Sequence, residues 1–363
     1  MTERRTPLII AHRGASGERP EHTLGAYRLA IEQGAEVIEP DLVVTADGHL
    51  IARHENDLGP TTDVAAHPEF AARRTTKVIN GVTRDGWFSE DFTLAEIRTL
   101  GARERYPAIR PASAAHDGED GVPELGEIVA LVRERAAAGA PEVAIYPELK
   151  YPTWFESEGT AQDGAPLRHQ IERLLVARLA ALGVTAPAQA MIQCFEIECL
   201  LDLKRHVMPA HGVDFPLVQL IGPLGTPGAP YDLRFAATRS FSTGEIYGEL
   251  ADLIELDGGV TWDALLHPDV LDWMARSYAR GVALAAADLL RPAGSAAVTA
   301  AHRAGLWVHA YTLRAEKPFL GLGTDGNPLT LEDTFRQLLA LGVDGIFTDH
   351  PGRVVQLRAE LTQ

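Results

Sequence analysis

Short apolar segments rich in β-branched residues alternate with longer segments of helical periodicity along most of this chain. This alternation constrains the fold more than any other feature, because strand, helix and strand in succession build a parallel βαβ unit. Strands are expected at 8–11, 37–44, 50–53, 143–149, 190–195, 217–221, 306–313 and 345–348, with weaker candidates at 258–262 and 282–286. Helices are expected at 24–33, 125–138, 167–182, 268–280 and 331–341. The pattern predicts an α/β fold, and its repetition favours a (β/α)8 TIM barrel.

The domain organisation follows from length and from two interruptions of this rhythm. The 363 residues, 46% of them hydrophobic, are enough for a large core, and α/β barrels often exceed 250 residues as one domain. Residues 57–123 are rich in turn formers and predict only a short helix near 93–100. Residues 222–257 form a second irregular stretch rich in Gly and Pro. We therefore expect one domain over 1–363, with 57–123 as a long insertion after an early strand.

Charge and composition exclude several classes of partner. A net charge of −17 repels phosphate backbones, so nucleic acid is not an expected partner. No apolar run approaches about 18 residues, so stable membrane insertion is not expected either. Cys194 and Cys199 are expected to be small buried residues rather than a disulfide or a zinc site. Because no leader-like segment opens the chain, we expect the cytoplasm, with the periplasm or secretion if a leader was removed. The sequence selects no oligomeric state.

Polar residues at two expected strands carry the first chemical signals. His12 and Arg13 follow the strand at 8–11, where barrel strands end at the active site. The Arg fork matches phosphate geometry, and the His can move protons near neutral pH. Glu39 and Asp41 are two residues apart in a strand and therefore face the same side. A hard divalent cation would satisfy two such carboxylates, although an exposed edge strand with solvated acids is the alternative.

Two further strand ends complete the set. His54 closes the segment 50–53 and supplies a second histidine for acid–base work, unless it is a surface loop residue. Glu148 and Lys150 share a face of their strand, where they could join a metal site and neutralise a phosphate, or form an internal ion pair. Weaker signals, each also typical of packing, come from Trp154, Phe155, Gln193, Phe195, Gln219, His309 and Tyr311. Together these residues are the inventory of a metal-assisted phosphodiesterase.

The ordered motifs resemble the glycerophosphodiester phosphodiesterase family from about residue 8 to residue 351. The segments that carry the resemblance are His12–Gly17, Pro20–Thr23, Glu39-Pro40-Asp41, His54-Glu55-Asn56, Tyr146–Lys150, Val308–Thr312 and Gly345–Asp349. The likeness to the bacterial periplasmic-type branch rests on Pro20–Thr23, Gln193-Cys194-Phe195 and the insertion. One departure is Glu55, which stands where the family commonly has Asp after its second histidine.

The resemblance implies an enzyme that hydrolyses glycerophosphodiesters, small-molecule substrates, to sn-glycerol 3-phosphate and an alcohol. Glu39, Asp41 and Glu148 would hold one divalent cation, with Ca²⁺ favoured by the branch and Mg²⁺ the rival in the cytoplasm. His12 is expected to act as base and His54 as acid, or the reverse. The catalytic set is completed by Arg13, and the expected substrate-binding residues are Arg13, Lys150, Trp154, Phe155, Phe195 and Gln219.

Two rival functions remain open from the sequence. A lysophospholipase D-type lipid phosphodiesterase would use the same metal and histidines, and a wide apolar mouth would favour it. A non-catalytic sugar-phosphate binder would lack one of the histidines or carboxylates, all of which are present here. The attacking group, water or a neighbouring glycerol hydroxyl, is also open.

Overall fold

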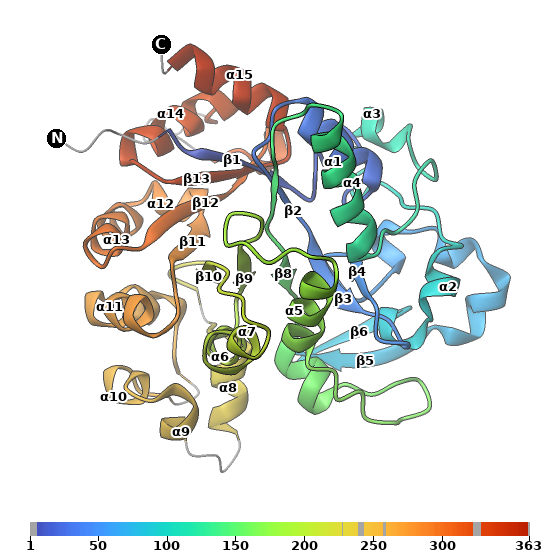
Figure 1. The fold of residues 1–363 in the computed structure, drawn as a ribbon, viewed down its shortest axis with the longest axis horizontal. Helices are drawn as coiled ribbons and strands as arrows, with labels where there is room; N and C mark the ends of the chain where they lie inside the picture. The colour runs from blue at the N-terminus through green and yellow to red at the C-terminus, as the bar shows by residue number, and fades with distance from the viewer. Residues whose placement is uncertain (1–5, 227, 239–242, 257–258, 322–327, 362–363) are drawn as a thin grey trace.

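The computed structural model describes residues 6–226, 228–238, 243–256, 259–321 and 328–361. Most strands in these ranges join one curled, mainly parallel sheet with helices packed outside it (Figure 1). Its strands are β1 (Leu8–His12), β2 (Val37–Glu39), β3 (Asp41–Val44), β4 (Leu50–Ala52), β7 (Ala144–Ile145), β8 (Glu148–Leu149), β9 (Ile192–Cys194), β10 (Leu217–Leu220), β11 (Gly281–Ala285), β12 (Trp307–Leu313) and β13 (Gly345–Thr348). The α/β class expected from the sequence is confirmed.

Two prolines interrupt segments that the sequence presents as continuous strands. Pro40 separates β2 from β3, and Pro147 lies between β7 and β8, because proline has no N–H for the strand ladder. On either side of these breaks, β2 pairs with β7 and β3 pairs with β8, both in parallel. Parallel pairing then continues from β8 through β9, β10, β11, β12 and β13 to β1, which pairs with β2. The short β4 pairs antiparallel with β3.

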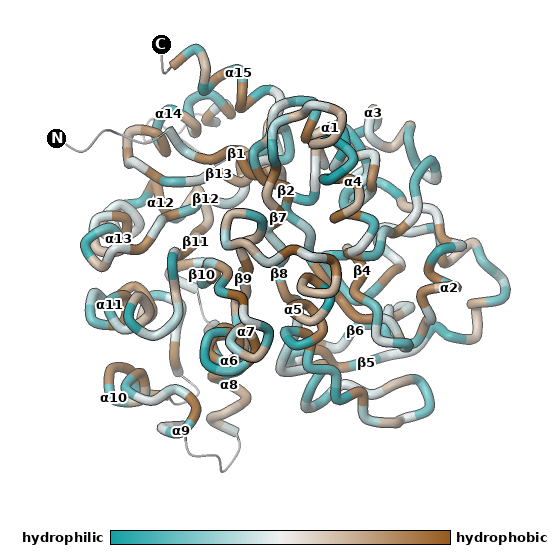
Figure 2. Tube along the Cα trace, viewed as in Figure 1, coloured by the Kyte–Doolittle hydropathy of each residue, from teal (hydrophilic) through white to brown (hydrophobic). Residues whose placement is uncertain are grey.

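Helices surround the sheet and bury its outer face. They are α1 (Leu24–Glu32), α2 (Leu94–Ile97), α3 (Pro111–Ala114), α4 (Leu125–Ala137), α5 (Ile171–Ala181), α6 (Ile197–Asp202), α7 (Met208–Ala210), α8 (Tyr231–Ala237), α9 (Thr243–Tyr247), α10 (Leu250–Leu253), α11 (Pro268–Ser277), α12 (Ala286–Leu289), α13 (Pro292–Arg303), α14 (Leu331–Leu341) and α15 (Pro351–Leu361). Helix α14 begins and ends at residues typical of helix ends. Thr330 forms a capping box with Asp333 at its start, and Gly342 ends it at φ 80°. Hydrophobic residues concentrate along the strands (Figure 2), and the buried ones form the core. Among the helices of the described residues, none combines the length and the apolar character that crossing a bilayer requires.

The insertion contains more structure than the sequence predicts. Besides α2 at the expected place, it holds α3 and an antiparallel hairpin of β5 (Thr75–Ile79) and β6 (Val82–Gly86). The Asn80–Gly81 turn, with φ 49° and 79°, is the one strong hairpin signal in a mostly polar segment. Lys77 anchors the hairpin, because its Nζ lies 2.8 Å from Glu90 Oε1 and 2.8 Å from Asp91 Oδ2 in a buried setting.

Two other expectations need correction. The stretch 222–257 is not wholly irregular, because its described part forms α8, α9 and α10. The weak strand expected at 258–262 is absent from its described part, 259–262, where Trp262 begins a 3₁₀ turn; residue 258 lies outside the described residues. The candidate at 282–286 is confirmed as β11.

Candidate active site

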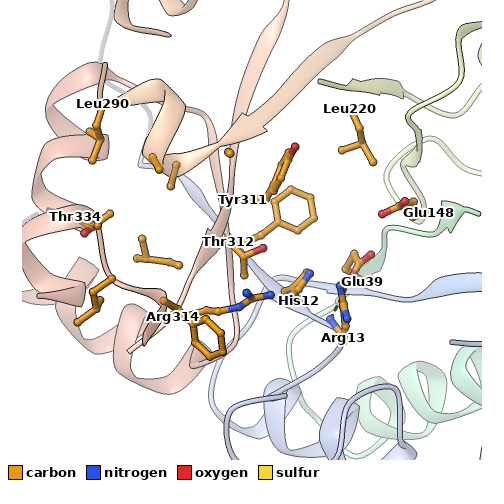
Figure 3. A pocket seen from close by; sticks show the side chains of 18 of the residues that line it. His12, Arg13, Glu39, Glu148, Leu220, Leu290, Tyr311, Thr312, Arg314 and Thr334 are labelled. Carbon is orange, nitrogen blue, oxygen red and sulfur yellow. Dashed lines mark hydrogen bonds between the residues drawn. The ribbon is translucent and has the colours of Figure 1, made fainter. Parts of the chain in front are cut away.

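The predicted site residues lie at the ends of adjacent strands. His12, the last residue of β1, is in register with Glu39 of β2, and Asp41 of β3 is in register with Glu148 of β8. Glu148 is in turn in register with Gln193 of β9. A cavity of about 690 Å³ opens over these strand ends (Figure 3). Its charged end is lined by His12, Arg13, Glu39, His54, Glu148 and Lys150.

Three buried carboxylates lie together beside this cavity. Glu39, Asp41 and Glu148 each offer an oxygen within 4.8 Å of the others. Burial and the neighbouring Asp41 hold the pKa of Glu39 well above its usual range, and burial raises the pKa of Glu148 to about 8. Burial opposes ionisation of Asp41 too, but Lys150 and Arg13 outweigh it and keep the pKa of Asp41 well below its usual range. Three oxygen donors that cannot all ionise on their own fit a hard divalent cation, which would favour the charged form of each.

Two positively charged side chains, Arg13 and Lys150, pair with these carboxylates. Arg13 places Nε 3.2 Å from Asp41 Oδ2 and Nη1 3.0 Å from Glu21 Oε1. Lys150 places Nζ 2.6 Å from Glu148 Oε1 and 3.5 Å from Asp41 Oδ1. Arg13 adopts a left-handed φ of 62°, a conformation that costs a non-glycine residue energy and clusters at functional sites. These contacts hold two positive side chains at the mouth of the carboxylate cluster, where an anionic phosphate can bind.

His12 is oriented by a buried acid. Its Nδ1 lies 2.6 Å from Asp349 Oδ1, just after β13, and Asp349 Oδ2 accepts from Arg110 Nη2 at 2.5 Å and Arg314 Nε at 2.9 Å. Despite burial, these partners hold the pKa of Asp349 well below its usual range. An ionised Asp349 only accepts, so the proton of neutral His12 is on Nδ1 and its Nε2 is free to take another. Burial is the main cause that lowers the pKa of His12 to about 4, and the positive charge of Arg13 is the second.

His54 is also oriented by an acid, as His12 is. Its Nδ1 lies 2.5 Å from Glu55 Oε1, and Arg105 of the insertion donates to both oxygens of Glu55, at 3.1 and 2.7 Å. Although burial opposes it, the bond from His54 and the charge of Arg105 keep the pKa of Glu55 below its usual range. Burial, followed by the charges of Arg13 and Lys150, lowers the pKa of His54 to about 3. Glu55 therefore makes the contact that a supporting acid requires, in spite of its departure from the common Asp.

Three residues expected to bind substrate lie outside the cavity. Trp154 is 2% exposed, donates from Nε1 to the Val78 carbonyl at 2.7 Å and packs on the fully buried Phe155. Gln219 is fully buried, and its amide donates to the Phe195 carbonyl at 2.9 Å. Gln219 lies on the opposite face of β10 from the cavity-lining Leu220, and its Oε1 accepts from the Tyr278 hydroxyl at 2.8 Å, so none of the three side chains lines the cavity. Phe195, by contrast, lines the cavity as expected.

Sequence reasoning missed several supporting residues. Asp349 could have been found, because it lies at the end of the last strand just as His12 lies at the end of the first. His22 contacts the cluster through Nε2, 2.9 Å from Asp41 Oδ2. Arg105 and Arg110 come from the insertion, and no local pattern distinguishes them from surface arginines. Their role is visible only once the insertion folds back on the strand ends.

A buried acid–base site at the strand ends of a curled α/β sheet is the arrangement of an enzyme. The profile of the glycerophosphoryl diester phosphodiesterase family matches residues 12–353, and the chain belongs to that family. Among its relatives, glycerophosphodiester phosphodiesterase GDPD6 of Arabidopsis thaliana is 32% identical over 95% of this chain and 84% of its own length.

Solved structures of two relatives share the fold. The glycerophosphodiester phosphodiesterase of Agrobacterium tumefaciens aligns with a TM-score of 0.54 at 20% identity, over 98% of this chain and 99% of its own. An Oleispira antarctica phosphodiesterase, solved in complex with the product sn-glycerol-3-phosphate, aligns with a TM-score of 0.56 at 17% identity, over 97% of this chain and 96% of its own.

Proposed function

We propose that this protein hydrolyses glycerophosphodiesters to sn-glycerol 3-phosphate and an alcohol, with one divalent cation and two-histidine acid–base catalysis. The observation that carries the proposal is the trio of Glu39, Asp41 and Glu148, with oxygens within 4.8 Å, beside two histidines that each face an acid. Membership of the family and the product bound to the Oleispira relative support the same reaction class. Small phosphodiesters are accordingly the proposed partners.

We propose that the scaffold is a single (β/α)8 barrel domain over 1–363, with 57–123 as its insertion. Counting β2 with β3, and β7 with β8, as strands broken by proline leaves eight parallel strands that pair in a ring. A ring of parallel strands places the carboxyl ends of all its strands at one face, and the site residues lie at that face.

The proposed chemistry assigns one task to each side chain. Arg13 and Lys150 bind the non-bridging phosphate oxygens, and Phe195 lines the wall beside them. His12 takes a proton from the attacking oxygen, which bonds to phosphorus as the bond to the alcohol oxygen breaks. The departing oxygen receives a proton from His54. A phosphate between Arg13 and Lys150 would offset the two charges that lower the pKa of His54, and so prepare it as an acid.

Glu39, Asp41 and Glu148 are the proposed ligands of the cation, for which Ca²⁺ is favoured and Mg²⁺ is the rival. A bound divalent cation would supply positive charge to the phosphate oxygens as negative charge gathers on them. Its binding would also relieve the raised pKa values of Glu39 and Glu148.

The test is release of sn-glycerol 3-phosphate from glycerophosphocholine by metal-stripped protein, with Ca²⁺, Mg²⁺ or EDTA added back. We expect release with a divalent ion and none in EDTA, and the more effective ion identifies the cofactor. Equal turnover in EDTA would contradict the metal-dependent mechanism, and absence of turnover with every ion would contradict the reaction.

The histidine roles have their own test. His12→Ala and His54→Ala should each lower kcat by roughly 10²–10⁴-fold, because each removes one proton transfer. His116→Ala, at a partly exposed position outside the cavity lining that pairs with Glu119, is the matched control and should keep wild-type turnover. Full activity in either catalytic-site variant would overturn its assignment.

A further inference from the structure

A second cavity, of about 310 Å³, lies apart from the candidate active site. It opens between the turn that follows β8 and the helices α5, α6, α8 and α9, and it shares no described lining residue with the active-site cavity. Figure 1 shows α5, α6 and α8 next to one another on the outside of the sheet. We call this space the acidic pocket, because four carboxylates line it: Glu156, Glu172, Glu198 and Asp202.

Positive charge around the acidic pocket is scarce. Among the described residues that line it, Arg173 is the one basic side chain, and its Nη2 lies 3.2 Å from Asp202 Oδ2. His206 also pairs with Asp202, at 2.8 Å, from an exposed position. Glu156 accepts a hydrogen bond at 2.6 Å from the neutral amide of Gln170. The basic side chains therefore offset the charge of Asp202, and they leave the other carboxylates of the pocket without a cationic partner among the described residues.

Glu172 is the residue that indicates a ligand. It lies in the first turn of α5, is 5% exposed and lines the pocket. Its carboxylate forms no hydrogen bond or ion pair with another residue that the structure describes, and the one amide that favours its charge is its own. Burial, with the charges of Glu156 and Asp202 added to it, raises the pKa of Glu172 to about 7. A buried carboxylate without a partner costs free energy, and a cation in the pocket would offset that cost.

A second carboxylate lacks a partner in the same way. Glu198 of α6 accepts no hydrogen bond from another described residue, and burial, followed by the charge of Asp232, raises its pKa to about 7. Asp232, fully buried in α8, accepts from the Glu198 amide through Oδ2 at 2.7 Å but has no partner for Oδ1. The protein behind the pocket therefore adds acidic groups rather than basic ones.

The cation that fits this lining is organic rather than a single metal ion. Within the described residues, the active-site trio is the one group of acidic or histidine side chains close enough to hold a metal ion together, so no three carboxylates of the acidic pocket lie within 4.8 Å of one another. A volume of about 310 Å³ suits a small ligand. Phe235, Ala236 and Ile246 line the same space, and an aromatic ring attracts an ammonium group that lies over its face.

We propose that the acidic pocket binds a small organic ammonium ion. Glu172 and Glu198 supply the negative charge that the ion meets, and Phe235 and Ile246 cover its alkyl groups. The site does not depend on the proposed function, because none of its residues belongs to the proposed catalytic set. It is a second binding site in the helical layer outside the sheet.

The first experiment is isothermal titration calorimetry on the full-length protein with Ca²⁺ present, in about 0.15 M NaCl so that exposed charges are screened. The probes are choline, a quaternary ammonium ion, and ethylammonium, a primary one. We expect saturable binding of one ion per chain, and the tighter probe identifies the kind of ammonium group. The neutral isostere of choline, 3,3-dimethylbutanol, should not bind. Absence of binding by both ions, equal binding of the isostere, or displacement by Mg²⁺ at the same concentration would each overturn the proposal.

A variant pair locates the site. Glu172→Gln keeps the shape of the side chain but removes its charge, so the Kd of the ammonium ion should rise about tenfold or more. Without ligand, this variant should unfold at or above the wild-type Tm, because it loses a buried charge that has no partner. Glu134→Gln, at a side chain that is 61% exposed and lines neither cavity, is the matched control and should keep the wild-type Kd. If Glu172→Gln does not fold, Glu198→Gln takes its place. An unchanged Kd in the folded variant would overturn the location.

Discussion

His12 and His54 have the same kind of partner but different surroundings. Asp349 holds His12 from within the core, where it is 1% exposed, whereas His54 and Glu55 lie nearer the surface with side-chain exposures of 31% and 16%. In both pairs the acid is held by arginines, which keep it ionised and fix the ring tautomer. The two proposed catalytic histidines are therefore oriented by acids, Asp349 and Glu55, that do not themselves line the cavity.

Asp349→Asn tests this preparation at the residue level. The amide can donate to Nδ1 of His12, so the ring would carry its proton on Nε2 and lose its function as a base. We expect kcat to fall by roughly 10²–10⁴-fold with an intact fold, measured by turnover and circular dichroism. Asp344→Asn, just before β13, is the control, because Asn can still accept from the Val308 amide. Turnover of Asp349→Asn at the wild-type rate would refute the positioning role.

The burial of His309 makes the stability of the folded protein depend on pH in the acid range. Burial lowers its pKa from 6.5 to about 4, and its Nδ1 lies 3.0 Å from the Tyr146 hydroxyl. Between these pKa values the unfolded chain binds the proton and the folded protein does not, so stability falls as pH drops from 6.5 to 4. The loss amounts to about 3 kcal/mol for a shift of this size.

His309→Gln removes this titration. Its Tm should be lower than that of wild type at pH 7, because a buried contact is lost, but should fall less steeply between pH 6.5 and pH 4. Thermal unfolding across that range measures both quantities. Parallel pH profiles for the two proteins would show that His309 does not contribute to acid lability.

At the level of elements, the insertion supports the site rather than merely covering it. Arg105 donates to Glu55 and to both oxygens of Glu21, and Glu21 in turn pairs with Arg13. One side chain of the insertion therefore orients both the proposed acid, His54, through Glu55, and the proposed phosphate-binding Arg13, through Glu21.

Arg105→Ala should consequently lower kcat/KM by about 10–100-fold, the range typical when a residue that orients a site is lost. Its neighbour Arg103→Ala is the matched control, because the Arg103 side chain is 55% exposed and pairs with Asp117 rather than with Glu55 or Glu21 in the part of the chain that the structure describes. Addition of guanidinium ion should restore part of the activity of Arg105→Ala if the loss arises from the missing cation. Equal kinetics for the two variants would remove the insertion from the mechanism.

For the whole molecule, the proposed cation couples activity to stability. Saturating Ca²⁺ at a hundred times its dissociation constant adds about 2.7 kcal/mol to the folded state. In a chain of this size we expect the Tm to rise by roughly 3–4 °C, and to return to its starting value in EDTA. Glu39→Gln should abolish most of the rise, whereas Glu332→Gln, in the exposed pair with Arg353, should leave it unchanged. A Tm that is independent of the ion would argue against the site.

Much of the site could be predicted because its residues obey local rules. Strand periodicity alone places Glu39 and Asp41 on one face. Position at a strand end alone indicates that His12, His54 and Glu148 belong to the site. The same rule failed for Trp154, Phe155 and Gln219, because whether an aromatic or amide side chain faces the cavity or the core depends on packing that periodicity does not contain. Pro40 and Pro147 mark the points where two strands break. The sequence does not indicate which strands the resulting halves pair with.

The sequence by itself determined the α/β class, the carboxylate trio and the two histidines, because strand alternation, capping and period-two spacing act over a few residues. Tertiary structure decided which acids and arginines hold those histidines. Asp349 is 337 residues from His12, and Arg105 is 50 residues from Glu55, so only the folded sheet and the folded insertion bring them together.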